Sequence, residues 1–142
     1  MKFCIIYKYQ TTKDKSQLGK ELEQLSSVIS DLGDNETFIF DRDVKNWSDV
    51  DIPRGESSKM MFSRINESDG VIAYVNHNDP SEGMAMESGY AKALNKKIVL
   101  ACKKGSSAPR VRSICDTYIE FDDMEDLKIQ IKDYLKSAFA VS

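Results

Sequence analysis

Residues 81–91, Ser81-Glu82-Gly83-Met84-Ala85-Met86-Glu87-Ser88-Gly89-Tyr90-Ala91, decide the fold of this chain. They follow an apolar run at 70–75 and a polar turn at 76–80, and a second apolar run at 98–102 comes soon after them. A strand, a loop, a helix of small residues and a further strand form the pattern of a parallel α/β unit. Gly83 and Glu87 lie four residues apart and so share one face of the expected helix. Open α/β sheets bind ligands at their carboxyl edge, where Glu87 can meet one.

The remaining segments extend the same α/β pattern along the chain. Apolar runs predict strands at 2–7, 37–40, 70–75, 98–102 and 118–121, and helices are expected at 18–32, 56–67, 79–94, 110–115 and 127–138. This alternation predicts a flavodoxin-like or Rossmann-like three-layer sandwich, with a five-stranded parallel sheet in the order 2-1-3-4-5 and helices on both faces. A length of 142 residues predicts one domain, 1–142. A long polar loop at 41–54 carries the only Trp, and loops of this length are often functional.

The composition excludes several classes of protein. With 20 basic and 23 acidic residues the net charge is −3, so no positive field for a nucleic-acid polymer is expected. No apolar run approaches the length of a membrane span, and the N-terminal apolar segment is too short for a signal peptide. Cys4, Cys102 and Cys115 match neither a zinc spacing nor a disulfide framework, so we expect three buried thiols in a reducing compartment. The sequence therefore predicts a cytoplasmic protein without a metal site or cofactor.

Glu87 is the strongest candidate for a catalytic residue. Most helical glutamates are exposed and have no special role, and this remains the alternative interpretation. However, the face that Glu87 shares with Gly83, Ala91 and Leu94 is otherwise small or apolar. A carboxylate on such a face is either energetically unfavourable or has a function.

The segment before this helix contains the other polar candidates. Asp79 as N-cap, Pro80 in the first turn and Glu82 three residues after the cap form a capping-box pattern. Ser81 then falls at the second helical position, where it is either an anion-binding group at the positive end of the helix dipole or a plain surface residue. His77 is the only histidine, and no Gly-x-Ser-x-Gly elbow accompanies it, which disfavours a serine hydrolase. Dinucleotide and Walker motifs are also missing.

The small-residue motif resembles that of a known enzyme family. It reads Ser81-x-Gly83-x-x-x-Glu87-x-Gly89-x-Ala91, with Asp-Gly-Val-Ile-Ala at 69–73 before it and Asn-Lys-Lys-Ile-Val-Leu at 95–100 after it. This pattern resembles the nucleoside 2-deoxyribosyltransferase family, which includes the 2'-deoxynucleoside 5'-phosphate N-hydrolases, over roughly residues 69–115. The resemblance implies that Glu87 attacks the anomeric carbon of the sugar, releases the base and forms a glycosyl-enzyme ester, with Tyr7 orienting Glu87. The protein would then be an N-glycosyl hydrolase or a 2-deoxyribosyltransferase.

The resemblance also implies a substrate branch and an oligomer. Six residues before the nucleophile, nucleoside transferases carry an acidic residue, whereas monophosphate hydrolases carry a Ser, and here the residue is Ser81. The segment Arg110-Val111-Arg112-Ser113 resembles the hydrolases, in which the matching Ser reaches the phosphate bound by the neighbouring subunit. The implied substrate is a (deoxy)nucleoside 5'-monophosphate, and the implied assembly is a homodimer or larger. The implied substrate-binding residues are Asp79, Ser81, Gly83, Arg110, Arg112 and Ser113.

Two departures from the family pattern leave alternatives open. The Gly-Ser loop of the hydrolases is replaced by Lys-Tyr-Gln-Thr-Thr-Lys at 8–13, and Met61 stands where they carry an Asp that contacts the sugar. Ribose and deoxyribose, and hydrolysis and transfer, therefore remain open. A looser similarity of 5–14 and 38–41 to Toll/interleukin-1-receptor-like domains gives a second hypothesis, an NAD glycohydrolase. A third hypothesis is a nucleotide-binding sensor without turnover, which Met61 would permit.

Overall fold

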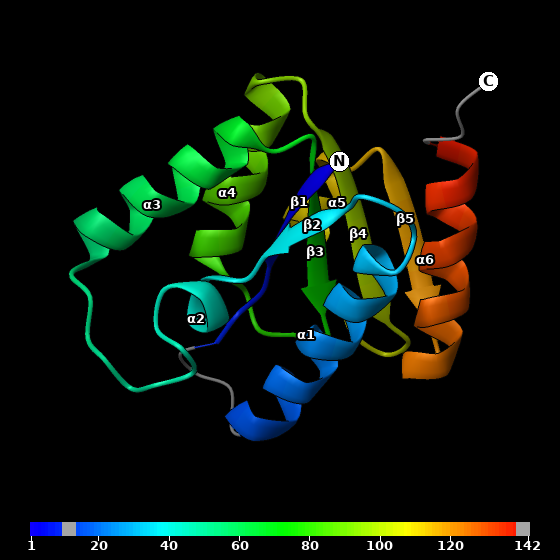
Figure 1. Cartoon of the computed structure of the whole chain (residues 1–142), viewed down its shortest axis with the longest axis horizontal. Coiled ribbons are helices and arrows are strands. Elements are labelled where there is room, and N and C mark those ends of the chain that lie inside the picture. The colour runs from blue at the N-terminus through cyan, green and yellow to red at the C-terminus, as the bar shows by residue number, and fades with distance from the viewer. Residues whose placement is uncertain (10–13, 139–142) are drawn as a thin grey trace.

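The computed structural model describes residues 1–9 and 14–138 as a parallel sheet covered by helices on both faces (Figure 1). The elements are β1 (Lys2–Ile6), α1 (Lys15–Ser30), β2 (Glu36–Phe38), α2 (Phe40–Asp43), α3 (Arg54–Glu67), β3 (Gly70–Val75), α4 (Glu82–Ala93), β4 (Lys97–Lys103), α5 (Pro109–Ile114), β5 (Thr117–Phe121) and α6 (Met124–Ala138). The five strands are all parallel and lie in the order β2-β1-β3-β4-β5. The predicted three-layer fold and strand order are confirmed.

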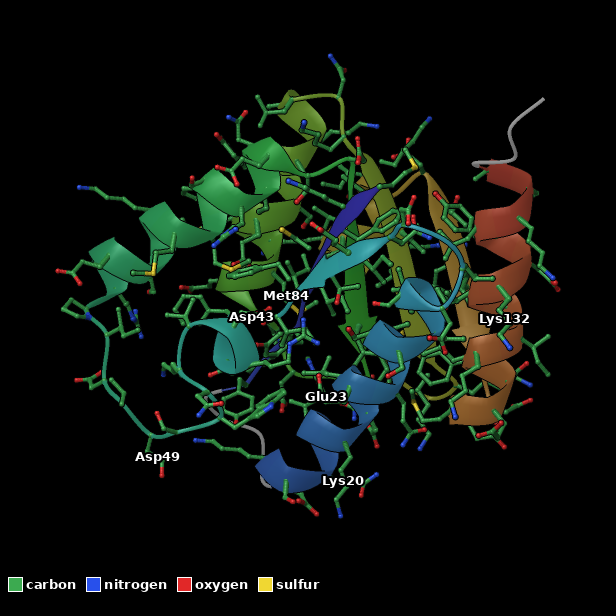
Figure 2. The ribbon with its side chains drawn as sticks, viewed as in Figure 1. Lys20, Glu23, Asp43, Asp49, Met84 and Lys132 are labelled. Atoms are coloured by element: carbon green, nitrogen blue, oxygen red, sulfur yellow. The ribbon has the colours of Figure 1, made fainter. Side chains whose placement is uncertain are left out.

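The sheet separates two apolar layers. Residues of β1 alternate between them, so that Phe3 and Ile5 pack under α1 and α6, whereas Cys4 and Ile6 pack under α3, α4 and α5. Because both faces are covered, the inner strands are continuous apolar runs rather than alternating ones. Figure 2 shows Lys20 and Lys132 pointing outward from α1 and α6, while Met84 of α4 is buried against the sheet.

The segment after β1 and β2 differs from the sequence-based prediction. Strand β2 ends at Phe38, two residues early, because Ile39 is the N-cap of the short helix α2. The carboxylate of Asp43 accepts the backbone N–H of Ile39 at 2.8 Å and so stabilises the start of α2. The predicted loop at 41–54 therefore contains a helical turn at its beginning, and α3 starts at its last residue.

The cysteine prediction is partly wrong. Cys4 and Cys102 are buried, but Cys115 at the end of α5 is only partly buried. All three are free thiols. Within the described residues, no helix combines the length and the apolar character that crossing a bilayer requires.

Candidate active site

Glu87 lies in the second turn of α4, the helix that follows the carboxyl end of β3. Strand β3 ends at Val75, and the chain returns along the face of the sheet as α4. Glu87 is partly buried, and burial raises the pKa of its carboxyl from 4.5 to about 7. Within residues 1–9 and 14–138 no hydrogen bond reaches this carboxylate. Burial is the main cause of the raised pKa values of Cys4 and Tyr7, and the charge of Glu87 adds to both.

The start of α4 differs from the predicted capping box. Ser81, with extended backbone dihedrals, is the N-cap, and its hydroxyl accepts the backbone N–H of Met84 at 3.2 Å. Asp79 is exposed and does not cap the helix. The carbonyl of Pro80 accepts a hydrogen bond from the Lys8 ammonium at 2.9 Å, which holds this part of the loop outside the helix. The Ser81 hydroxyl keeps its own proton to donate, so it remains available to an anion.

Tyr7 lies directly after β1, and its hydroxyl is bound to Asp41 rather than to Glu87. It donates to the Asp41 carboxylate at 2.6 Å and accepts the backbone N–H of Asp41 at 2.9 Å. A phenol has one proton, and here that proton forms the hydrogen bond to the Asp41 carboxylate. The expectation that Tyr7 orients Glu87 thus remains a hypothesis. It would require the Tyr7 hydroxyl to give up its hydrogen bond to Asp41 and donate to Glu87 instead.

Asp41, which contacts Tyr7, is a further candidate that sequence reasoning missed. Its side chain is buried, with only 6% of the residue exposed, and burial raises its pKa although Tyr7, Lys45 and Lys15 act in the opposite direction. Its ion pair with the Lys45 ammonium is long, at 4.0 Å. The sequence signal that could have identified Asp41 is its position: it is the first residue of the long loop, directly after the second predicted strand.

The turn after α2 holds Asp41 in place. The backbone N–H of Trp47 donates to the carbonyl of Asp41 at 2.7 Å, and Asn46 and Trp47 have left-handed φ angles of 51° and 59°. The ring of Trp47 lies against Gly19 of α1, where a larger side chain would contact it at 3.5 Å. Tyr9 lies between Trp47 and Tyr7, with ring centroids at 6.5 and 6.1 Å. Non-glycine residues with left-handed φ angles, such as Asn46 and Trp47, persist where surrounding contacts stabilise that backbone conformation.

The residues predicted to bind phosphate do not form one cluster within the chain. Ser113 on α5 is exposed and donates its hydroxyl to the Arg110 carbonyl at 2.6 Å. The Arg112 guanidinium lies 3.4 Å from the ring centroid of Tyr118. In the described part of the chain, no hydrogen bond or ion pair joins these residues to Ser81. Gly83 is exposed on α4, with open space where a side chain would stand.

Two further residues named in the sequence analysis have clear positions. Met61 on α3 is buried in the layer that also contains Met84, so the place of the expected sugar-binding Asp is apolar. Burial and the charge of Lys8 lower the pKa of His77, which favours a neutral imidazole. Residues 10–13 of the divergent loop lie outside the described residues.

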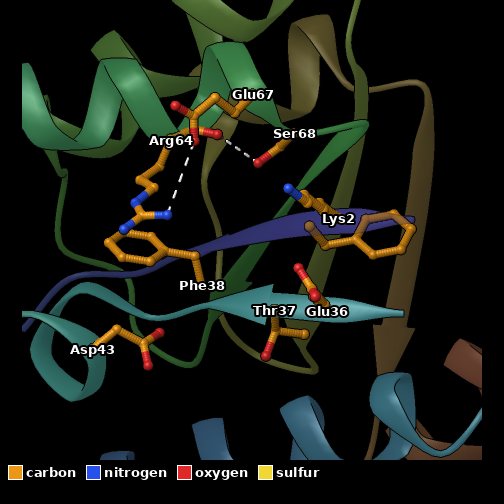
Figure 3. Close-up of a pocket in the computed structure, with 9 residues that line it drawn as sticks. Lys2, Glu36, Thr37, Phe38, Asp43, Arg64, Glu67 and Ser68 are labelled. Carbon is orange, nitrogen blue, oxygen red and sulfur yellow. Dashed lines mark hydrogen bonds and ion pairs between the residues drawn. The ribbon is translucent and has the colours of Figure 1, made fainter. Parts of the chain in front are cut away.

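A hollow of about 290 Å³ lies between α3 and the β1–β2 edge of the sheet (Figure 3). Its lining residues are Lys2, Phe3, Glu36, Thr37, Phe38, Asp43, Arg64, Glu67 and Ser68. The guanidinium of Arg64 lies 5.0 Å from the ring centroid of Phe38, and it pairs with Glu67 at 3.9 Å. Charges of both signs line this hollow, and it shares no residue with the group formed by Tyr7, Asp41, Ser81 and Glu87.

Comparison with known protein families identifies the family of this chain. The sequence model of the nucleoside 2-deoxyribosyltransferase family matches residues 18–131. The chain belongs to this family. The resemblance seen at 69–115 is thereby confirmed, and this deoxyribosyltransferase-family protein is an enzyme of the N-glycosidase or 2-deoxyribosyltransferase type. Members act on small nucleoside or nucleotide substrates.

Solved structures share the architecture of this deoxyribosyltransferase-family chain. The CMP N-glycosidase BcmB of Clostridium botulinum has a TM-score of 0.69 and 20% identity, with 95% of this chain and all of that chain covered. A conserved protein of Enterococcus faecalis V583 has a TM-score of 0.70, 13% identity and coverage of 94% and 98%. The 2-deoxyribosyltransferase of Bacillus psychrosaccharolyticus has a TM-score of 0.60, 18% identity and 90% coverage of both chains. At these identities the likeness describes the fold. No curated protein matches the chain in sequence.

Proposed function

We propose that this protein cleaves the N-glycosidic bond of a nucleoside 5'-monophosphate, with Glu87 as the nucleophile. The observation that carries the proposal is the Glu87 carboxylate itself: partly buried, on a helix that starts at the carboxyl edge of the sheet, and without a hydrogen bond from the described residues. Such a group is costly to ionise, and its carboxylate is more basic than an ordinary one, which suits attack on a sugar carbon.

The proposed reaction proceeds in two displacements. The Glu87 oxygen forms a bond to the anomeric carbon while the bond from that carbon to the base nitrogen breaks. The electron pair of the broken bond leaves with the base, which takes up a proton from solvent. Water then attacks the same carbon of the glycosyl ester. It gives one proton to solvent and releases the Glu87 carboxylate and the sugar phosphate. With a second base in place of water, the same intermediate would give transfer.

Ser81 supports the choice of a 5'-phosphate. Its hydroxyl and the first N–H groups of α4 lie at the positive end of the helix dipole, which favours an anion. Asp79 does not occupy the cap, so it does not use this end of the helix. We place Ser113, Arg110 and Arg112 at the phosphate of a neighbouring subunit in a homodimer or larger assembly. One or two charge-assisted hydrogen bonds would contribute about 2–4 kcal/mol.

The test is a panel of substrates followed by chromatography for free base. The panel holds CMP and dCMP, the other ribo- and deoxyribonucleoside monophosphates, the matching nucleosides, and NAD; CMP is included because the Clostridium botulinum structure is a CMP N-glycosidase. We expect kcat/KM for the best monophosphate to exceed that of its nucleoside by about thirty- to a thousandfold. Glu87→Gln should lose turnover by several orders of magnitude while keeping the fold, and it serves as the blank.

The other outcomes separate the alternatives. Base release from NAD alone would support the glycohydrolase hypothesis. Binding of a nucleotide without release would support a sensor. Equal rates on nucleoside and monophosphate would place the protein in the nucleoside branch, and near-normal release by Glu87→Gln would reject the nucleophile.

A further inference from the structure

We infer that both edges of the sheet are closed at their carboxyl ends to a strand of a second copy, each by two side chains that take the place of one residue of that strand. The edge strands are β2 and β5. An edge strand directs a row of backbone N–H and C=O groups outward, and through these groups another copy can extend the sheet. The inference concerns how copies of this protein associate, and it does not depend on the proposed reaction.

The register of β2 shows which of its backbone groups point outward. The N–H of Glu36 donates to the carbonyl of Met1 at 2.8 Å, so Glu36 directs its backbone groups toward β1. Because the direction alternates along a strand, Thr37 and Ile39 direct theirs away from the sheet. In a parallel ladder, one residue of an added strand would donate to the Thr37 carbonyl and accept the Ile39 N–H.

Two side chains of α2 already bind these outward groups. The Arg42 guanidinium donates to the Thr37 carbonyl at 3.1 Å, and the Asp43 carboxylate accepts the Ile39 N–H at 2.8 Å. Asp43 lies beside the carboxyl end of β2 (Figure 3). Arg42 also donates to the Asp43 carboxylate, at 3.0 and 3.1 Å, and to Glu23 of α1 at 2.8 Å. The donor and the acceptor are therefore fixed to each other and to the body of the protein.

The β5 edge has the same arrangement. The carbonyl of Phe121 accepts a backbone hydrogen bond at 2.9 Å from the residue that follows β4, so Glu120 and Asp122 direct their backbone groups outward. The side-chain amide of Gln130 on α6 donates to the Glu120 carbonyl at 2.8 Å, and the Asp126 carboxylate accepts the Asp122 N–H at 2.9 Å. The Gln130 amide also donates to the Asp126 carboxylate, at 3.2 Å.

The two closures share one geometry although different helices supply them. Each binds the carbonyl of one residue and the N–H of the residue two positions later, which is the pair that one residue of an added parallel strand would bind. In each, the carboxylate belongs to the residue four positions after the N–H that it accepts. The same arrangement at both edges indicates that the sheet is terminated rather than merely capped. Copies of the chain then associate through helical surfaces and not through a continuous sheet.

The experiment opens the β5 edge with the double substitution Asp126→Leu/Gln130→Leu. The average mass is measured by light scattering over a range of concentrations, and we expect it to rise by about twofold or more above that of the unchanged protein. The matched control is Glu125→Leu/Ser137→Leu. It also loses one negative charge and gains two leucines on α6, but it leaves the edge contacts in place, so its mass should equal that of the unchanged protein.

A third substitution separates strand pairing from simple apolar adhesion. Glu120→Pro, added to the opened variant, removes an outward N–H and leaves the ladder with β4 in place, so it should restore the mass of the unchanged protein. A raised mass that persists with this proline would overturn the inference, because association would then not use the edge. An opened variant that keeps the mass of the unchanged protein would overturn it as well.

Hydrogen exchange locates the contact in the opened variant. At low concentration the Asp122 amide should exchange about tenfold faster than in the unchanged protein, because its carboxylate partner is gone, and it should regain protection as the mass rises. If the side chains only stabilise the fold, the melting temperature falls, the mass stays constant and protection does not return. That result would contradict the inference.

The β2 edge provides a second test if the opened α6 variant does not fold. Arg42→Leu removes the donor to the Thr37 carbonyl, whereas Glu23→Gln removes the ion pair of Arg42 and leaves the guanidinium at the edge. We expect the mass to rise with concentration in Arg42→Leu alone. Equal behaviour of the two variants would show that the guanidinium does not close this edge.

Discussion

Helix α4 holds Ser81 and Glu87 in a fixed relationship, because Ser81 caps the helix through the Met84 N–H and Glu87 follows six residues later. At the helical rise this separation is about 9 Å along the axis. A single rigid element thus carries both the proposed anion seat and the proposed nucleophile, at a spacing comparable to a sugar with its phosphate. Proposed functional groups on one helix need no loop movement to come together.

The capping role of Ser81 yields a matched pair of variants. Ser81→Ala removes both the cap and the hydroxyl, so it should destabilise the fold by about 1 kcal/mol and weaken the monophosphate preference. Ser81→Asp keeps a capping oxygen but adds a negative charge, so it should retain stability and lose most of the preference. Thermal melts and the ratio of kcat/KM for monophosphate and nucleoside measure the two effects separately. A Ser81→Asp protein that still prefers the monophosphate would contradict phosphate binding here.

The raised pKa of Glu87 predicts a pH dependence of activity. The nucleophile must be ionised, and burial holds its pKa at about 7. Activity should therefore be low at pH 5, rise through pH 7 and level off above it. The profile of kcat/KM against pH reports the free enzyme, with a poorly reactive substrate used so that chemistry limits the rate. An acidic limb near the ordinary carboxyl value of 4.5 would show that Glu87 is not the titrating group.

The same group predicts a pH dependence of stability. The folded pKa of Glu87 lies above its ordinary value, so its stabilising contribution is complete below pH 4.5 and lost as the pH rises to about 7. The full loss corresponds to roughly 3 kcal/mol. Glu87→Gln stays neutral throughout, so its melting temperature should exceed that of the unchanged protein at pH 8. At pH 4.5 the two should be similar. A melting-temperature difference that is equal at both pH values would contradict this assignment.

The centre of the sheet was predictable from sequence because its inner strands are buried on both faces. The run at 70–75 is an unbroken apolar segment, and β3 has these bounds. The start of α4 was not predictable, since Asp79 and Pro80 match a capping pattern as well as Ser81 does. The contact of the Lys8 ammonium with the Pro80 carbonyl, which joins distant parts of the chain, accompanies the cap at Ser81. Asp41 was missed for a similar reason: its burial depends on Tyr7, 34 positions away.

The proposed sharing of sites between subunits can be tested by mixing two inactive variants. Ser113, which belongs to the phosphate site in the proposal, is exposed on α5 and bonds only to Arg110 among the described residues, so it is available to a second copy. Glu87→Gln lacks the nucleophile, and Ser113→Asp places a negative charge at the neighbour's phosphate site. Each homodimer should therefore be inactive on low concentrations of the monophosphate. A dimer of one variant with the other has one site that combines an intact Glu87 with an intact Ser113.

Subunit exchange between the two variants should therefore restore activity to about a quarter of the unchanged protein, since half of the dimers are mixed and each has one good site. Light scattering before and after mixing measures the assembly, and each variant mixed with itself is the control. If Ser113 acts within its own subunit, every mixed dimer has two damaged sites and no activity returns. A monomer that is fully active at micromolar concentration would contradict the shared site altogether.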